Sequence, residues 1–376
     1  MQIYIPVPDP ITPQWLTSVL LQSGVLQQGE VQAVERETTG AFNSQTSRLL
    51  LHYSPEAGPQ TPARLILKQN TREAWSKEAG RDEVQFYTLV ASLRDHPPVL
   101  APCYVAAYDE QSGNSYLLLQ DLSATHHAPV TREQLISIVE AVPARADIEA
   151  VVDTLAQLHA YWWNSPLLET GTLDVGYWSR NEERFEQYVQ RRKTSWESLI
   201  AAEAAWFPGD LRALYEQVFA RLSYHWQRYL EPRFRTRTNL TLTHGDAYFA
   251  NFLTPRWPAT SPTYLLDWQS PGFDVAAYDL VNLCSTFWTF EQRHEEQREE
   301  HILPRYHTGL LEHGVHNYSW DDLLTDYKTG LIFWLLVPLQ DRYGGSSRDY
   351  WWPKMQCLTA AFREWRCEEL LGVSIQ

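Results

Sequence analysis

Three polar residues in one forty-residue stretch are candidates for metal-assisted chemistry. Asp246 and Asn251 lie five residues apart in the segment HGDAYFAN, and Asp267 opens the tripeptide Asp-Trp-Gln. The short apolar runs 240–242 and 264–266 end just before these residues, which predicts two brief strands that present polar side chains at one edge. Carboxylate and amide oxygens are the ligands that Mg²⁺ prefers, together with substrate phosphates. For any one residue a polar turn is the simpler explanation, but the ordered set favours a functional site.

A lysine far upstream could supply positive charge to the same chemistry. Lys68 ends the strand-like run ARLILK, and residues 71–93 then carry a helical pattern of apolar and charged positions. A carboxylate on this helix could hold the lysine in place. We expect Glu83, which directly precedes the apolar stripe, to do so, with Glu78 as the alternative.

These residues match the requirements of phosphoryl transfer. That reaction needs a cation on the phosphates, metal ions that bridge them and an acidic residue that orients the acceptor hydroxyl. Lys68 could supply the first, Asn251 and Asp267 the second, and Asp246 the third. The five-residue step from Asp246 to Asn251 suits a loop that presents a base and a metal ligand to one centre.

A small-residue turn, residues 38–44, lies between the first two expected strands. Such a turn can lay backbone N–H groups over phosphates, and Gly40, Asn43 and Ser44 are the residues that we expect there. An ordinary hairpin loop is the alternative, and one glycine does not decide between the two.

The elements that must position these side chains change in type along the chain. A short helix over 10–22, with Thr12 as its N-cap, precedes strand-like runs at 32–37, 47–53, 63–68, 103–108 and 116–120. The remainder is mainly helical. Helices are predicted over residues 131–141, 147–163, 181–202, 210–230, 287–313, 320–339 and 350–371. The chain is too long for one core, so we expect a strand-rich N-terminal lobe (1–120) and a larger helical C-terminal lobe (121–376).

The composition limits the classes of function. The net charge is −15, which disfavours a nucleic-acid partner. Four cysteines at spacings that match no zinc or disulfide framework indicate a reducing compartment. The N-terminus has no signal-peptide pattern, and the longest apolar run, 331–339, is too short to cross a bilayer. We therefore expect a cytoplasmic protein without a membrane partner, in which the charged run 291–300 is a solvated helix face.

The segment HGDAYFAN resembles the H-G-D-x4-N catalytic loop of the aminoglycoside phosphotransferase and choline kinase-like families, which belong to the protein-kinase-like superfamily. Asp267-Trp268-Gln269 stands where protein kinases have D-F-G. YLLLQDL (116–122) is similar to the interlobe hinge. LAQLHAYWW (155–163) and DVAAYDL (274–280) are most similar to the ecdysteroid-kinase-like branch.

This resemblance implies an α+β, two-lobed protein-kinase-like fold, with a small antiparallel-sheet N-lobe and a larger mainly helical C-lobe, and ATP and Mg²⁺ as cofactors. It also implies a role for each matching residue: Asp246 as catalytic base, Asn251 and Asp267 as Mg²⁺ ligands, Lys68 on the α- and β-phosphates, Glu83 as its ion-pair partner, Gln120 and Leu122 as hinge contacts to the nucleotide, His244 as a structural residue and Asp279 as the brace of the catalytic loop.

The reaction expected is phosphorylation of a hydroxyl group on a small molecule. Aminoglycoside-, choline- and lipophilic-alcohol-like acceptors all remain open, as does ATP versus GTP. The acceptor site is expected after Asp267 and around the aromatic-rich segment 161–178, which includes Trp162, Trp163, Tyr177 and Trp178.

Two other functions compete with this one. An inactive nucleotide-binding module that acts through partners would have lost the base, a metal ligand or the lysine, and all are present. A protein kinase switched by activation-loop phosphorylation is disfavoured because Gly245 replaces the arginine of H-R-D.

Overall fold

The computed structural model describes residues 4–39, 44–93, 95–169, 181–257 and 261–372. By its internal contacts the chain divides into two compact units. Within the described parts, unit 1 comprises residues 1–127 and 255–271, and unit 2 comprises residues 128–170, 174–254 and 272–376. Residues 255–271 thus belong with the N-terminal sheet, although most of unit 2 separates them from it in sequence. The predicted division into residues 1–120 and 121–376 does not include this second segment of unit 1.

Unit 1 contains a five-stranded sheet in which every neighbouring pair is antiparallel, in the order β1-β2-β3-β5-β4. Its strands are β1 (Val31–Thr39), β2 (Ser44–Tyr53), β3 (Arg64–Asn70), β4 (Cys103–Tyr108) and β5 (Ser115–Gln120). The short strands β6 (His126–His127) and β9 (Tyr264–Leu265) also lie in this unit. In β9, Leu265 forms a parallel bridge with Leu100 and so ties the late segment to the N-terminal part of the chain.

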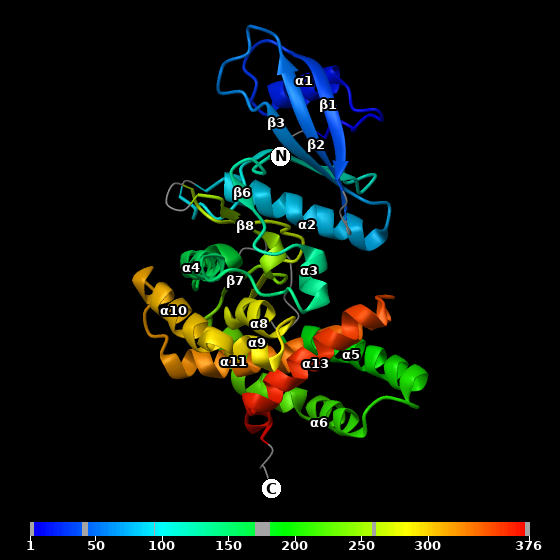
Figure 1. The fold of residues 1–376 in the computed structure, drawn as a ribbon, viewed down its shortest axis with the longest axis vertical. Coiled ribbons are helices and arrows are strands. Elements are labelled where there is room, and N and C mark those ends of the chain that lie inside the picture. Colours follow the sequence, from blue (N-terminus) through cyan, green and yellow to red (C-terminus); the bar gives the residue numbers. More distant parts are fainter. Residues whose placement is uncertain (1–3, 40–43, 94, 170–180, 258–260, 373–376) are drawn as a thin grey trace. The chain divides into compact units, whose positions relative to one another are not determined.

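The two helices of unit 1 are α1 (Pro13–Gln22) and α2 (Ala74–Ala91) (Figure 1). The N-cap of α1 is Thr12, as predicted, and its hydroxyl accepts a hydrogen bond from the Trp15 N–H. The buried face of α1 shares a core with Leu65 and Leu67 of β3. Because side chains alternate along a strand, Lys68 points to the opposite face, where α2 supplies its partner.

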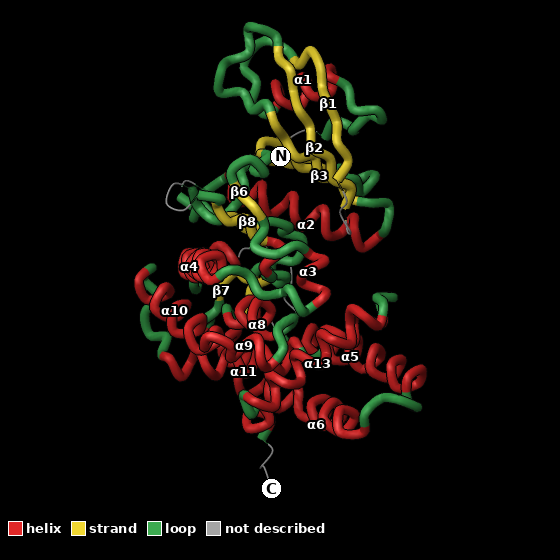
Figure 2. The backbone as a smooth tube through the Cα atoms, viewed as in Figure 1, coloured by secondary structure: helices red, strands yellow, loops and turns green. Residues whose placement is uncertain are grey.

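Unit 2 is mainly helical (Figure 2). Its helices are α3 (Arg132–Ser137), α4 (Arg145–Tyr161), η1 (Pro166–Glu169), α5 (Glu182–Glu203), α6 (Gly209–His225), the π-helical η2 (Trp226–Leu230), α7 (Glu231–Thr236), η3 (Phe249–Asn251), α8 (Ala277–Ser285), α9 (Phe290–His294), η4 (Glu295–Gln297), α10 (Arg298–Glu312), α11 (Trp320–Trp334), α12 (Val337–Tyr343), α13 (Arg348–Glu364) and η5 (Cys367–Leu371). Together with unit 1, this confirms the predicted α+β class.

Two short strands and one buried helix position the central loop of unit 2. Strand β7 (Thr241–Thr243) pairs antiparallel with β10 (Gly272–Asp274), and β8 (Phe252–Pro255) leads from unit 2 into unit 1. Helix α8, which the sequence analysis did not predict, is buried along its whole length. It packs closely on α11, because a Cβ at Gly330 would lie 2.9 Å from the Val281 side chain. This packing fixes the position of α8 within unit 2.

The prediction of one continuous helix over 287–313 is wrong. Helix α9 begins after the capping box of Thr289 and Gln292, and the backbone reverses at Glu296 and Gln297, whose φ angles are 55° and 56°. Helix α10 starts anew at Arg298. The predicted helix over 320–339 is likewise divided into α11 and α12, and that over 350–371 into α13 and η5.

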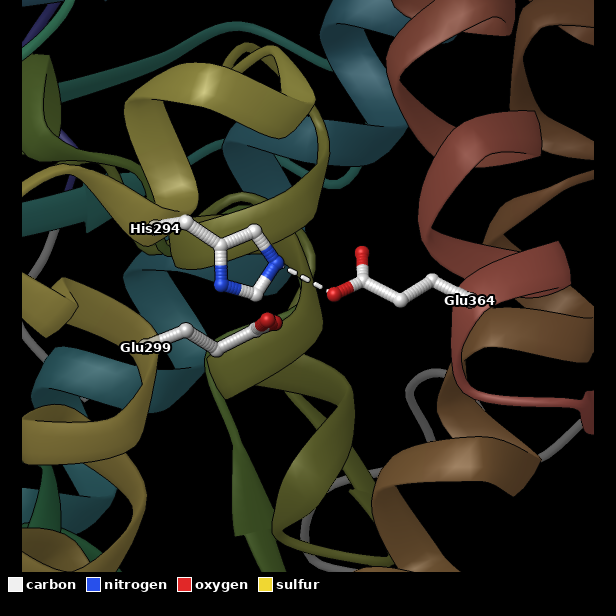
Figure 3. Close-up of side chains that lie close together, drawn as sticks. All are labelled: His294, Glu299 and Glu364. Atoms are coloured by element: carbon white, nitrogen blue, oxygen red, sulfur yellow. Dashed lines mark hydrogen bonds and ion pairs between the residues drawn. The ribbon is translucent and has the colours of Figure 1, made fainter.

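The charged run 291–300 is only in part the solvated helix face that was predicted, because Glu291, Glu295 and Glu300 are exposed whereas Arg293 and Glu299 are buried. Arg293 is fully buried and its guanidinium bonds Glu299, at 2.9 Å, and Glu364. His294, Glu299 and Glu364 point toward one another (Figure 3). Arg293 already supplies both carboxylates with a cation, so the group is an ion-pair network that links α9, α10 and α13. The backbone reversal at residues 296–297 makes this network possible.

The four cysteines of the chain form no disulfide among the described residues, and Cys284, Cys357 and Cys367 are buried. None of the helices that the structure describes is long and apolar enough to cross a membrane.

Candidate active site

Lys68 of β3 lies between two carboxylates in unit 1. Its Nζ atom is 2.7 Å from a carboxylate oxygen of Glu83 on α2 and 2.5 Å from Oδ1 of Asp267. Glu83 is therefore the partner of Lys68, as predicted, whereas Glu78 is exposed on the same helix. The contact with Asp267 bridges 199 residues of sequence.

The three charged groups differ in their access to solvent. The Glu83 side chain is 4% exposed, Lys68 is 13% exposed and Asp267 is 31% exposed. Burial alone would lower the pKa of Lys68, but the charges of Asp267 and Glu83 overcome it and raise the pKa to about 12. Burial, aided by the nearby Asp267 charge, raises the pKa of Glu83 although Lys68 opposes this. One permanently charged ammonium is thus shared by two carboxylates.

Trp268 connects this ion-pair cluster to the hydrophobic interior of unit 1. Its backbone N–H donates to Glu83 Oε1 at 3.2 Å, and its indole Nε1 donates to the Leu265 carbonyl at 2.9 Å. The fully buried indole stacks on Phe86 of α2, with ring centroids 4.1 Å apart. Glu83 and Phe86 therefore fix the segment that carries Asp267 to α2. The sequence analysis noted Trp268 only as part of the tripeptide and assigned it no role.

Asp267 has a backbone conformation that non-glycine residues rarely adopt. Its φ angle is +65°, in the left-handed region, where aspartate is among the few residues that occur with some frequency. Its carbonyl accepts a hydrogen bond from the Gln269 N–H at 2.9 Å. The chain thus turns sharply at the residue that contacts Lys68.

In unit 2, the loop after β7 is held by the fully buried carboxylate of Asp279 on α8. This carboxylate accepts hydrogen bonds from the backbone N–H groups of His244, at 2.7 Å, and Gly245, at 3.0 Å. Gly245 has a φ angle of +79°, which most side chains would make unfavourable. The expected bracing of this loop by Asp279 is therefore present in the structure.

A further layer of buried groups supports Asp279. His159 of α4 is 3.1 Å from the Asp279 carboxylate through Nε2 and 2.6 Å from the Tyr306 hydroxyl through Nδ1. Burial alone would raise the pKa of Asp279, but the hydrogen bond and charge of His159, with those of His244, hold it below its usual value. His159 is thus a packed residue of α4, and its contact with Asp279 was not foreseen from the sequence. Its spacing from the HGD segment gives no signal of this.

The loop is also closed on itself. The Asp246 carbonyl accepts hydrogen bonds from the Asn251 side-chain amide, at 2.9 Å, and from the Tyr248 N–H, at 3.1 Å. The His244 ring accepts from the Asp246 N–H at 3.3 Å. The five-residue step from Asp246 to Asn251 therefore forms one compact turn, with the buried His244 as part of its frame.

A comparison with known protein families decides the family. The sequence model described as the phosphotransferase enzyme family matches residues 56–310, more than half of the chain. The chain belongs to this family. The match spans Lys68, Glu83, Asp246, Asn251 and Asp267, and it supports phosphotransfer as the reaction. A search of curated proteins found no significant match.

Solved structures agree with the fold of this phosphotransferase-family protein. An ethanolamine kinase from Plasmodium vivax is 13% identical, with 88% of this chain and 83% of that chain covered and a TM-score of 0.52. A GDP complex of aminoglycoside 2'-phosphotransferase-IIIa is 13% identical over 94% of this chain and 99% of that chain, with a TM-score of 0.48. At such identities a structural likeness shows the fold alone. The family match confirms the predicted phosphotransferase family, and the likeness to the ethanolamine kinase confirms the predicted fold.

The other predicted site residues of the phosphotransferase-family chain lie in unit 1. Gly40 and Asn43 are outside the described residues, and Ser44 opens β2 with its hydroxyl 3.3 Å from that of Thr46. Gln120 ends β5 and pairs with Leu65. The buried Leu122 follows, and its carbonyl accepts hydrogen bonds from the Thr125 and His126 N–H groups. The structure thus brings together Lys68, Glu83 and Asp267 in unit 1 and the turn from Asp246 to Asn251 in unit 2.

Proposed function

We propose that this protein is an ATP- and Mg²⁺-dependent phosphotransferase that phosphorylates a hydroxyl group of a small molecule. The observation that carries the proposal is the Lys68 ammonium, 2.7 Å from Glu83 and 2.5 Å from Asp267. A buried lysine held on a strand by a helix carboxylate suits contact with nucleotide phosphates, and a carboxylate beside it suits a phosphate-bound cation.

In this proposal Glu83 positions the lysine and Lys68 binds the α- and β-phosphates. Glu83 is almost fully buried and also accepts a hydrogen bond from the Trp268 N–H, so its place is set independently of any nucleotide. Asp267 is the more exposed of the two carboxylates. In this proposal Glu83 is therefore the permanent partner of Lys68, and Asp267 is the partner that a nucleotide phosphate can replace.

The types of donor atom that Asn251 and Asp267 carry suit a magnesium ion. Asn251 commits its amide nitrogen to the Asp246 carbonyl at 2.9 Å, so its side-chain oxygen is the atom that we assign to the metal, with the Asp267 carboxylate as the second ligand. Oxygen donors of this kind are those that Mg²⁺ takes in proteins. When bound, the ion would neutralise phosphate charge and help to orient the transferred group.

Asp246 is the residue that we assign to the acceptor. Its carboxylate would orient the hydroxyl and accept its proton as the hydroxyl oxygen bonds to the γ-phosphorus. The bond from that phosphorus to the bridging oxygen breaks, and ADP leaves with the electron pair. The turn that carries Asp246 is fixed by Asp279 and Asn251, so little conformational freedom is lost there when the acceptor binds.

An ADP-release assay with ATP or GTP and a panel of hydroxylated compounds tests the proposal. The panel contains aminoglycosides, macrolides, amino alcohols, sterols and simple alcohols. We expect release that depends on the acceptor and on Mg²⁺ and that EDTA abolishes. Absence of release with every acceptor, or equal release by the Asp246→Asn variant, would contradict the proposed function. The cytoplasmic location expected from the sequence is part of the same proposal, and fractionation of the source cells tests it.

A further inference from the structure

A buried lysine in unit 2 lies among aromatic rings. Lys354 of α13 is 5% exposed, and its Nζ atom is 2.9 Å from Oδ2 of Asp341 on α12. The same ammonium lies 5.5 Å from the ring centroid of Phe287 and 5.2 Å from that of Tyr350. Both distances are within the range of an attractive contact between a cation and a ring face.

These rings form a continuous group with the loop that carries Asp246. Tyr248 is two residues after Asp246, and its ring centroid is 6.3 Å from that of Phe287. Phe287 in turn lies 6.2 Å from Tyr350. We call Tyr248, Phe287, Tyr350, Lys354 and Asp341 the aromatic–lysine cluster.

The charge of Asp246 acts on this cluster. Burial alone would lower the pKa of Lys354, but the carboxylate of Asp341, with smaller contributions that include Asp246, raises it above its usual value. Burial raises the pKa of Tyr350, on which Asp246 and Arg132 also act with opposite signs. The proposed base and the aromatic–lysine cluster thus share one electrostatic environment.

Aromatic rings beside a carboxylate commonly enclose an organic ammonium group. Here the chain's own ammonium contacts two of the three rings and pairs with Asp341. Among the described residues, Asp246, Asp341 and Arg132 are charged groups that act on Tyr350 or Lys354. A cation of the chain itself already lies on these rings, and the charge of a second cation brought by an acceptor would be repelled there.

We propose that Lys354 determines specificity by excluding amines, and that the acceptor is an uncharged hydroxyl compound with an apolar body that packs on the rings of the aromatic–lysine cluster. This inference rests on the proposed function, in which Asp246 orients the acceptor hydroxyl. It selects among the acceptor classes that the sequence leaves open, against aminoglycosides and choline-like amines and in favour of lipophilic alcohols.

A matched pair of acceptors isolates the effect of charge. Choline is compared with the alcohol in which a carbon atom replaces its quaternary nitrogen, since the two have the same shape. We expect the wild-type enzyme to prefer the uncharged compound in kcat/KM by about tenfold, the size of one unfavourable charge contact in a partly solvated site. The variant Lys354→Met should lose most of this preference.

Two further variants serve as controls. Lys328→Met removes a lysine that pairs with Glu369 at 3.2 Å elsewhere in unit 2, and it should keep the preference of the wild type. The double variant Lys354→Met/Asp341→Asn removes both members of the ion pair, so that no carboxylate is left without its partner. It should fold and lose the preference, which separates specificity from stability.

Equal or better use of choline by the wild type overturns the proposal, and so does an unchanged preference in both Lys354 variants. If neither compound supports ADP release, calorimetric titration of the same pair and variants measures the preference in binding. Failure of both compounds to bind places the acceptor elsewhere and also overturns the proposal. Failure of the proposed phosphotransferase function gives a different result: the wild type then releases no ADP with any acceptor of the full panel.

Discussion

Two carboxylate-centred clusters, one in each unit, hold the candidate site residues in different ways. In unit 1, Glu83 and Asp267 share the ammonium of Lys68, and Asp267 is 31% exposed. In unit 2, Asp279 is fully buried and accepts two backbone N–H groups and a histidine. The first cluster depends on the attraction between charged side chains, and the second mainly on hydrogen bonds to the main chain.

The contact of Asp267 with Lys68 can be exchanged for another partner of the lysine, whereas the contacts of Asp279 with the main chain cannot. A partly exposed ion pair contributes little to stability, so Asp267 can leave Lys68 at a small cost. Removal of a buried acceptor leaves donors without partners, which costs far more. We therefore expect the Lys68 cluster to govern activity and the Asp279 cluster to govern both activity and stability.

The largest effect is expected from the residue that the Asp279 cluster positions. Asp246→Ala should lower acceptor-dependent ADP release by about a thousandfold, the contribution typical of a positioned base. The Asp279 contacts remain, so the thermal unfolding midpoint should stay near that of the wild type. ADP-release kinetics and calorimetric melting check this, and turnover near the wild-type level would remove Asp246 from the role of base.

Removal of the Asp279 carboxylate should lower both activity and stability. Asp279→Ala leaves the N–H groups of His244 and Gly245 without an acceptor, and we expect the free energy of unfolding to fall by roughly 3 kcal/mol. Asp279→Asn keeps one acceptor oxygen and should lose less. Denaturant unfolding measures both variants. An Asp279→Ala protein with wild-type stability would show that the two clusters do not differ as described.

For the Lys68 cluster the expected loss is in catalysis. Lys68→Ala should lower kcat/KM for the nucleotide by roughly a hundredfold, because a charge directed at the phosphates is removed. As a control, Lys77→Ala removes a lysine of α2 that donates to the Ser112 carbonyl at 2.8 Å, and it should leave nucleotide kinetics unchanged. Unaltered kinetics in Lys68→Ala would exclude this lysine from the nucleotide site.

Burial in unit 2 should also make stability depend on pH. Burial lowers the pKa of His225 from 6.5 to about 4, so the unfolded chain binds a proton on this residue that the folded chain does not. Its contribution is complete above pH 6.5 and is lost as the pH falls toward 4.

Between pH 6.5 and about pH 5 the free energy of unfolding should fall by roughly 2 kcal/mol through His225. His225→Phe keeps an aromatic ring beside Tyr229 and Phe333 and should remove this part of the pH dependence. Denaturant unfolding at several pH values compares the two proteins. The same slope in both would show that His225 does not titrate as stated.

The smallest effect tests the packing behind the Lys68 cluster. Trp268→Phe keeps a ring on Phe86 but removes the donor to the Leu265 carbonyl, a loss of about 1 kcal/mol in the free energy of unfolding. Trp268→Ala also removes the stacked ring and should cost several times more. Chemical unfolding of the pair checks this order, and equal losses would mean that the stack contributes nothing.

Local patterns in the sequence were sufficient to predict most of the helices and strands. The cap of α1 at Thr12, the alternation in the strands and the apolar stripe of α2 each depend on neighbouring residues, and each is present as predicted. Lys68 and Glu83 could be paired because only 15 residues separate them. The family motif indicated Asp246, Asn251 and Asp267 as site residues, and their roles stay predictions.

The remainder depends on contacts that no local pattern records. The break between α9 and α10 accompanies the burial of Arg293, whose partner Glu364 is 71 residues away. The support of Asp279 by His159 spans 120 residues, and the stack of Trp268 on Phe86 joins segments that are still further apart in sequence. In these places tertiary structure overrides local preference, and two residues of a charged run, Arg293 and Glu299, are buried.

The return of residues 255–271 to unit 1 affects the order in which the protein can be completed on the ribosome. The partner of Phe86 in the stacked pair is Trp268, which is synthesised only after most of unit 2. The nascent N-terminal sheet must therefore leave that apolar surface of α2 uncovered while more than a hundred further residues are added. A fragment that ends at residue 127 should reproduce this interval as a soluble chain that binds chaperones or hydrophobic dyes, and a synthetic 255–271 peptide should reduce that binding.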